Sequence, residues 1–201
     1  KGGPFSPWYY DLDLVVQWRN GGDQIRAFPK SRPQNIGHFR RIGITWPFRT
    51  QKGLNTRAFP AGSAFTIQGM AAFHETNDDD EVLVLLALTN STAFKQLLLL
   101  VVGFFAFQTG PMSSIPIPKM EEPRRNDLIR IAKSAWFHKL SLDSVCETSH
   151  AFLLPAKLRA RLGDFEFDSF ENELYNLQVE VDEIAFDLYG FSDIDRAAAV
   201  E

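Results

Sequence analysis

An apolar seam near the C-terminus constrains the fold more than any other feature of the sequence. Six apolar residues follow one another at spacings of four and three: Phe170, Leu174, Leu177, Val181, Ile184 and Leu188. This spacing is the a/d pattern of almost three heptads, and it puts apolar side chains on one face of an α-helix. Gly190 follows as a C-cap residue. The seam has to pack against protein, either on the core of this chain or on another helix of a longer protein.

Charge is distributed unevenly along the 201 residues. Residues 1–161 contain 20 Lys and Arg against 13 Asp and Glu, whereas residues 162–201 contain one Arg against 12 acids. The net charge of −4 is therefore the sum of +7 and −11, and it says little about binding partners. Basic residues are densest in residues 1–60. A second basic cluster comprises Lys119, Arg124, Arg125, Arg130, Lys133 and Lys139.

Cysteine usage and hydropathy indicate the setting of the chain. Cys146 is the single cysteine, so no internal disulfide can form, which favours a reducing, cytoplasmic environment. The longest apolar run, residues 97–107, contains a glycine and is too short to span a bilayer, and no signal peptide is visible. We therefore expect no membrane partner. Because the chain opens on Lys1 and not on methionine, we expect it to be part of a longer protein.

Local patterns predict an α+β fold. Alternation of Leu12, Leu14 and Val16 with less apolar residues predicts a strand, and residues 38–46 and 64–75 read as two more. "TNDDD" supplies the cap of a helix that starts near Glu81, and residues 93–102 form a second apolar segment. Both segments are nearly all apolar, so strands remain an alternative for them.

The second half of the chain reads differently. Residues 103–118 are expected to be extended, because Pro116 and Pro118 keep the residues before them out of a helix. Beyond Pro123 an amphipathic helix is predicted, with an apolar face made of Leu128, Ile131, Ala132, Ala135, Trp136 and Leu140. The expected architecture is a small twisted mixed sheet with packed helices, followed by a helical C-terminal segment.

Common catalytic patterns are missing from the sequence. It contains neither a glycine-rich phosphate-binding loop nor a Gly-x-Ser-x-Gly elbow. It has no carboxylate two residues before a lysine, as many restriction nucleases have, and no Pro-Pro dipeptide, which the base-clamping loop of amino-methyltransferases contains. Cys146 and His150 are two candidate ligands without a second pair, which does not make a zinc site. We expect no catalytic residue, metal or cofactor in this chain.

A basic, aromatic stretch, "FRRIGITWPFRTQKGLNTRAF", runs from Phe39 to Phe59 and contains no acid. Phosphate contacts require Lys or Arg, and base edges are read by Arg, Lys, Asn, Gln, Ser or Thr. Arg40 and Arg41 are consecutive in a predicted strand and so point to opposite faces, which leaves at most one of them to hold phosphate on the surface of the following loop. The candidate DNA-binding residues are Lys30, Arg32, Arg40, Arg41, Arg49, Thr50, Gln51, Lys52, Asn55 and Arg57. The alternative is that these side chains are only solvated.

Several blocks of sequence occur in an order typical of one family. They are "KGGPFSPWYYDLDLVVQW", "RIGITW", "RAFPAGSAFTIQG", "LLALTNS", "SSIPIP", "AKSAWFHKLSLDSVCETSHAFLLPAKL" and "LQVEVDEIAFDLYGF". With them, nearly the whole chain resembles the C-terminal target recognition region of large adenine-specific DNA methyltransferases, namely fused restriction-modification enzymes and the methyltransferase of BREX phage-defence systems. Thr89 departs from the leucine more usual in the "LLALTNS" block, which affects packing only.

The resemblance implies a non-catalytic reader of double-stranded DNA. Residues 1–163 would be the DNA target recognition domain, and residues 164–201 an acidic helical segment with the heptad seam. An upstream domain of the same polypeptide would bind S-adenosylmethionine and methylate adenine at N6, with or without a restriction endonuclease activity. Two other classes stay open on the residues alone: an assembly module that uses the heptad helix, and a self-contained enzyme.

Overall fold

The fold is α+β, as predicted, with a small antiparallel sheet. The computed structural model describes residues 3–103 and 106–200. The central strand β1 (Gly43–Pro47) pairs with β2 (Arg57–Phe59) on one side and with β3 (Gly69–Ala72) on the other. In the register, Ile44 lies between Ala58 and Ala72. The three strands are antiparallel rather than mixed, and among the described residues the parallel pairing is an isolated bridge between Trp8 and Arg57.

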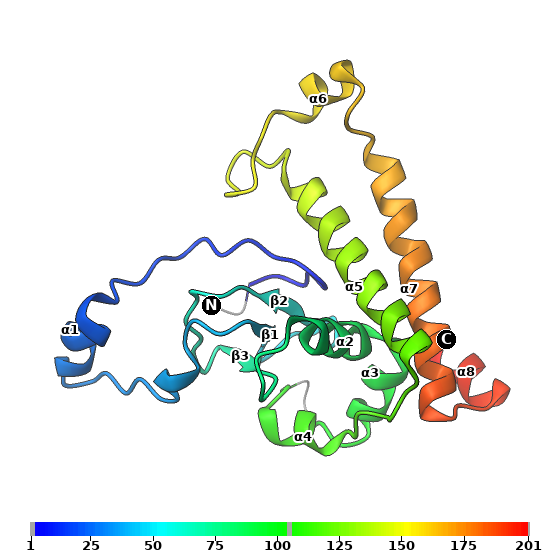
Figure 1. Cartoon of the computed structure of the whole chain (residues 1–201), viewed down its shortest axis with the longest axis horizontal. Coiled ribbons are helices and arrows are strands. Elements are labelled where there is room, and N and C mark those ends of the chain that lie inside the picture. Colours follow the sequence, from blue (N-terminus) through cyan, green and yellow to red (C-terminus); the bar gives the residue numbers. More distant parts are fainter. Residues whose placement is uncertain (1–2, 104–105, 201) are drawn as a thin grey trace.

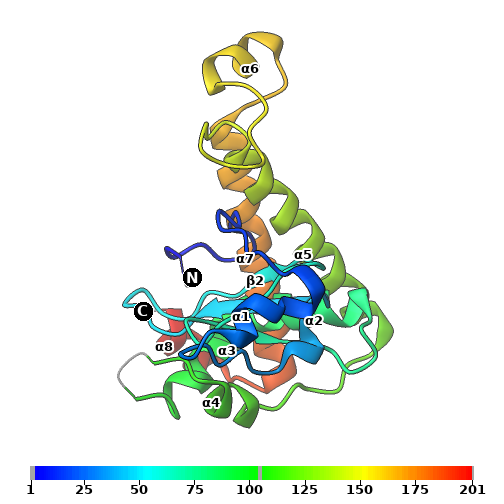
Figure 2. The ribbon, with the colours of Figure 1, turned by 90° about the vertical axis from the view of Figure 1, so that its left-hand side faces the viewer.

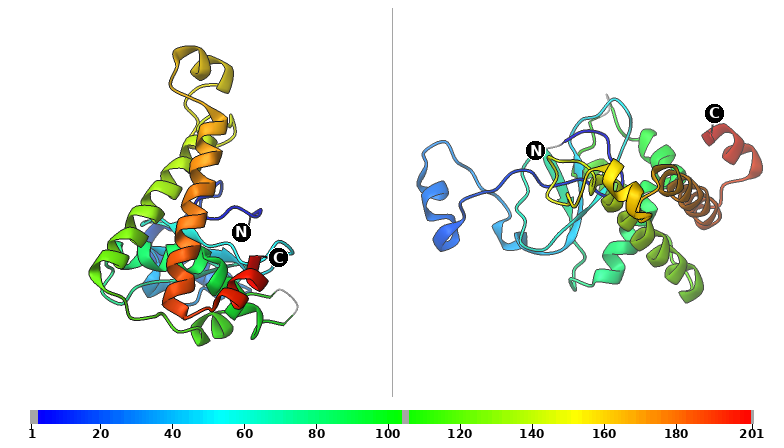
Figure 3. Two further views of the ribbon diagram at one scale, coloured as in Figure 1. Left: turned by 90° about the vertical axis from the view of Figure 1, so that its right-hand side faces the viewer. Right: turned by 90° about the horizontal axis from the view of Figure 1, so that it is seen from above.

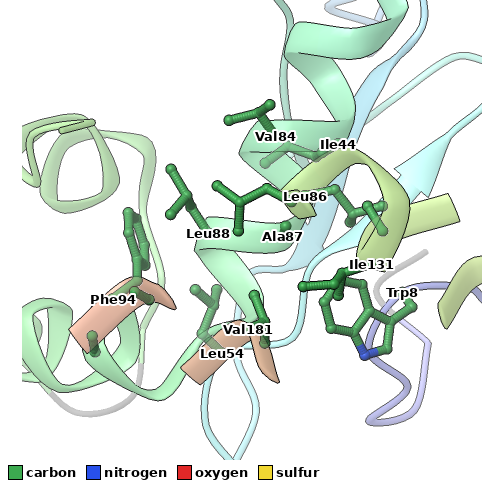
Figure 4. Packing of buried hydrophobic residues seen from close by; sticks show 14 of the residues in the cluster. Trp8, Ile44, Leu54, Val84, Leu86, Ala87, Leu88, Phe94, Ile131 and Val181 are labelled. Atoms are coloured by element: carbon green, nitrogen blue, oxygen red, sulfur yellow. The ribbon is translucent and has the colours of Figure 1, made fainter. Parts of the chain in front are cut away.

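Two helices in the middle of the chain form the centre of the core. They are α2 (Asp79–Asn90) and α3 (Thr92–Leu99), so the alternative of strands here is wrong. The Asp78 carboxylate caps α2 by accepting from the backbone N–H groups of Asp80 and Glu81. Leu86, Ala87 and Leu88 are fully buried and pack with Ile44 of the sheet, as Figure 4 shows. One face of the sheet is thereby covered.

The two longest helices, α5 (Glu122–Asp143) and α7 (Phe167–Tyr189), run antiparallel beside each other (Figures 1 and 3). The predicted seam lies on α7, where Val181 is fully buried and Leu177 is nearly so. α7 packs on α5 and α3, and its buried residues belong to the same core as those of α2. The helix ends at Gly190, whose φ of 71° is the left-handed C-cap conformation. The seam is therefore buried by this chain itself, whereas the division into two domains at residue 163 remains a prediction.

Shorter elements complete the chain. They are η1 (Arg19–Gly22), α1 (Asp23–Ala27), η2 (Ile36–His38), α4 (Thr109–Ser114), α6 (Ala156–Leu162) and α8 (Asp193–Val200). Figures 1 and 2 show α5 and α7 rising together from the sheet towards α6, while residues 10–32 extend away from the sheet on another side. Within the described ranges no single helix is long and apolar enough to cross a membrane. α2 and α3 taken together pass by length and composition, but the chain bends by 66° between them.

Four predicted segments differ from the structure. Residues 9–18 form no strand, and Leu14, Val15 and Val16 are exposed, because the backbone pairs with β2 only around Trp8. The strand predicted at 38–46 begins only at Gly43, since Arg40 has a left-handed φ of 71° that turns the chain. The strand predicted at 64–75 shrinks to β3. The stretch expected to be extended contains α4, and its residues 104 and 105 lie outside the described residues.

Candidate nucleic-acid interface

The first basic cluster consists mostly of cations without a carboxylate partner. Residues 19–52 contain eight Lys and Arg and a single acid, Asp23. Seven of the eight are exposed and form no ion pair with any described residue: Arg19, Arg26, Lys30, Arg32, Arg40, Arg49 and Lys52. This part of the surface therefore has a positive charge that the chain does not neutralise, as an anionic partner requires.

The second basic cluster is different, because most of its charge is neutralised within the chain. Arg125 on α5 pairs with Glu81 of α2 at 2.9 Å, and this bond raises the pKa of Arg125. Lys133 pairs with Asp80 at 3.3 Å. Two more arginines of α5 reach acids of α7: Arg124 pairs with Asp187 at 3.1 Å, and Arg130 with Glu180. Two acids of the C-terminal segment, Glu180 and Asp187, thus help to hold α7 against α5.

A short loop presents part of the first cluster. It runs from Phe48 to Gly53 between β1 and β2. Its base is fixed, because the N–H of Phe107 donates to the carbonyl of Phe48 at 2.8 Å and the Arg49 guanidinium lies 5.4 Å from the Phe48 ring. Its tip is free, with Gln51 and Lys52 exposed ahead of Gly53, which has a φ of 88°. Thr50 is half-buried and accepts from the N–H of Lys52. The loop can project Arg49, Gln51 and Lys52 into a groove.

Asn55 and Arg57, which the sequence suggested as DNA contacts, do not belong to this loop surface, because both side chains are buried within the chain. Asn55 is fully buried and Arg57 is 4% exposed. The Arg57 guanidinium donates to the backbone carbonyls of Pro4 and Ser6 and to the side-chain oxygen of Asn55. It also lies 4.8 Å from the centre of the Tyr10 ring, and burial lowers its pKa to about 10. These two side chains fasten the N-terminal segment to the sheet.

Arg40 and Arg41 lie before β1 and not in a strand, and their side chains have different surroundings. Arg41 donates to the backbone carbonyls of His74 and Glu75 and lies against the Phe73 ring, so it fixes the segment before α2. Arg40 is exposed and lines a pocket. Its left-handed backbone places it outside β1. Arg40 remains a candidate for contact with phosphate, whereas the guanidinium of Arg41 is already hydrogen-bonded within the chain.

That pocket, of about 490 Å³, lies against the sheet. Thr45 and Arg57, which are direct partners in the register, line it from the face opposite to Ile44. Half-buried aromatic rings form part of its wall: Trp18 lies 5.1 Å from Phe39, and Phe39 lies 5.2 Å from Phe65. The residues come from three separate segments, so no local sequence signal indicated the pocket. In the described part of the chain no group of His, Cys, Asp and Glu could hold a metal ion.

Burial separates a structural arginine from surface ones, and this can be tested. Arg57→Ala is expected to lower the free energy of unfolding by about 3 kcal/mol, because a buried charge-assisted hydrogen-bond set is lost and the carbonyls of Pro4 and Ser6 lose their Arg57 donor. Arg49→Ala is expected to leave it unchanged, since Arg49 is exposed. Urea denaturation followed by circular dichroism measures both. Equal stability of the two variants would contradict the structural role of Arg57.

The fold and these contacts define an α+β module with one basic surface whose cations lack carboxylate partners among the described residues. No family model matches the sequence. The chain is similar to the adenine-specific methyltransferase PglX of Lacticaseibacillus casei, with 26% identity over 213 residues and 96% of this chain covered. It is also 25% identical over 197 residues to the adenine-specific methyltransferase BrxX of Escherichia coli, with 95% covered. The chain spans only 17% and 16% of the length of these relatives.

Proposed function

We propose that this chain is the sequence-reading module of an adenine-specific DNA methyltransferase, and that it binds double-stranded DNA without catalysing the reaction itself. The observation that carries the proposal is the contrast between the two basic clusters. The cations of residues 19–52 have no carboxylate partner among the described residues, whereas four of the five Lys and Arg residues of α5 are paired. The similarity to two adenine-specific methyltransferases supplies the context in which a basic module would meet DNA.

Within this module the loop Phe48–Gly53 is the reader. Arg49, Gln51 and Lys52 carry the groups that recognise base edges, and their side chains are exposed at a loop whose base is fixed. A fixed base matters because a base-reading side chain has to be held in register with the duplex. Arg40, beside the pocket, would contact phosphate.

The remaining parts of the reaction belong, in this proposal, to the rest of a longer polypeptide. An upstream methyltransferase domain would bind S-adenosylmethionine and transfer the methyl group to adenine in a phage-defence system of the BREX type. The alternative of an assembly module built on the heptad helix has less support, because the seam of α7 is already covered by α5 and α3.

The reading role is tested in the methyltransferase polypeptide that carries this chain, by sequencing the sites it methylates. Arg49→Ala or Lys52→Ala is expected to relax or shift the preference at a single base position, because one base contact contributes about 1–3 kcal/mol of discrimination. Lys133→Ala removes a paired cation from α5 and serves as the matched control for Lys52→Ala. If both loop variants methylate the original site at the wild-type rate, the loop does not read the sequence.

A further inference from the structure

Residues 19–32 form an arm that contributes almost nothing to the core. Gly22 is its one buried residue, and α1, only five residues long, packs mainly on η1. The arm is attached at its base, where the Trp18 ring lies over Gly22 and against Phe39; a side chain added at Gly22 would come within 2.8 Å of that ring. Figure 1 shows the arm extending away from the sheet as its own projection.

The arm is also strongly basic. It carries Arg19, Arg26, Lys30 and Arg32 against the single acid Asp23, and none of the four cations forms an ion pair with a described residue. Arg32 donates only to neighbouring backbone carbonyls, those of Pro29 and Ser31. Four like charges on a segment that buries no apolar cluster do not stabilise the fold of this chain. They are suited to a partner with regularly repeated negative charge.

The position of the arm favours DNA as that partner. Trp18, at its base, lines the same pocket as Phe39 and Arg40, so the arm begins beside the residue proposed to contact phosphate. A duplex that contacts both Arg40 and the loop Phe48–Gly53 would have the base of the arm beside its backbone. Basic side chains along the arm would then meet phosphates, which carry no sequence information but add affinity and fix register.

We propose that the arm is a phosphate clamp that holds the DNA backbone outside the bases read by the loop. This inference rests on the proposed function. It adds Arg19 and Arg26 to the earlier candidates Lys30 and Arg32 as residues that contact DNA phosphates. Each phosphate contact contributes about 0.9 to the slope of log affinity against log salt, so the clamp accounts for a slope of up to about 3.6.

The clamp is tested with two double variants. Each variant replaces one arginine and one lysine by alanine. R26A/K30A removes two cations of the arm, and R130A/K133A removes two paired cations of α5. Fluorescence anisotropy is recorded over a range of salt with a random duplex of about three helical turns and one of about a single turn. On the longer duplex R26A/K30A should bind at least tenfold more weakly, with a salt slope lower by about two, while the control binds as the wild type does. On the shorter duplex R26A/K30A should lose little affinity relative to the wild type.

The outcomes separate the clamp from the reader. If the wild type binds both duplexes but R26A/K30A behaves like the control, the clamp is wrong and the proposed function stands. If R26A/K30A loses the same affinity on both duplexes, the arm lies within the read sequence and its placement outside is wrong. If the wild type binds neither duplex at low salt, the proposed function itself fails. Thermal denaturation should show that R26A/K30A keeps the wild-type midpoint, since both side chains are exposed.

Discussion

Val181→Asp is expected to abolish the fold of the chain or to destabilise it by about 4 kcal/mol or more. Val181 is fully buried in the seam of α7, among the core residues that α2, α3 and α5 contribute. A carboxylate at this position would lose its water without gaining a hydrogen-bond donor, and the methyl groups of valine would be lost from a packed site. Since domains are stable by only about 5–15 kcal/mol, one such change removes much of the total.

The matched control is Val179→Asp on the same helix. Val179 is 46% exposed, so its replacement by aspartate should change the free energy of unfolding by less than about 1 kcal/mol. Thermal and urea denaturation, followed by circular dichroism, measures both variants. If Val181→Asp melts like the wild type, the seam is not buried in solution, and the arrangement of α7 on α5 is wrong.

The seam could be predicted from sequence because its signal is local. Six apolar residues spread over almost three heptads specify a helix and the face that it buries, and Gly190 marks the end. The cap at Asp78 is local in the same way. The strand predicted around Leu14 failed because alternation indicates only that a segment suits a sheet. Distant residues decide whether a neighbouring strand is present. Here the N-terminal segment pairs with the β2 region only at Trp8.

The same reasoning explains the errors in the candidate site. Asn55 and Arg57 follow the loop Phe48–Gly53 closely, and their side chains are of types that can contact DNA. Their burial depends on Pro4 and Ser6, about fifty residues earlier in the chain, and no pattern around residue 55 reveals this contact. The sequence does place Arg49, Gln51 and Lys52 together, because they lie in one loop.

The two basic clusters look alike in the sequence, and only the structure distinguishes them. The acids that neutralise α5 lie 44 to 63 residues away along the chain, in α7 and at the start of α2. Charge counts cannot identify such pairs. Pairing also explains why an acidic C-terminal segment is compatible with DNA binding elsewhere, because part of its charge is used in contacts with α5.

The largest effect on binding is expected from salt. If about six cations of the first cluster contact phosphates, the affinity of the chain for a random duplex should fall roughly 10³-fold between about 50 and 200 mM salt, because each contact releases condensed counterions. The cations available for these contacts are Arg19, Arg26, Lys30, Arg32, Arg40, Arg49 and Lys52. Binding should be weak at high salt because contacts between these cations and phosphates are electrostatic.

Fluorescence anisotropy of a labelled duplex, titrated with the chain at a series of salt concentrations, tests this central claim most directly. A steep linear fall of log affinity with log salt, reduced by Lys52→Ala and unaffected by Lys133→Ala, is the result that a DNA-binding module predicts. Affinity that does not change with salt, or no binding even at low salt, would contradict it.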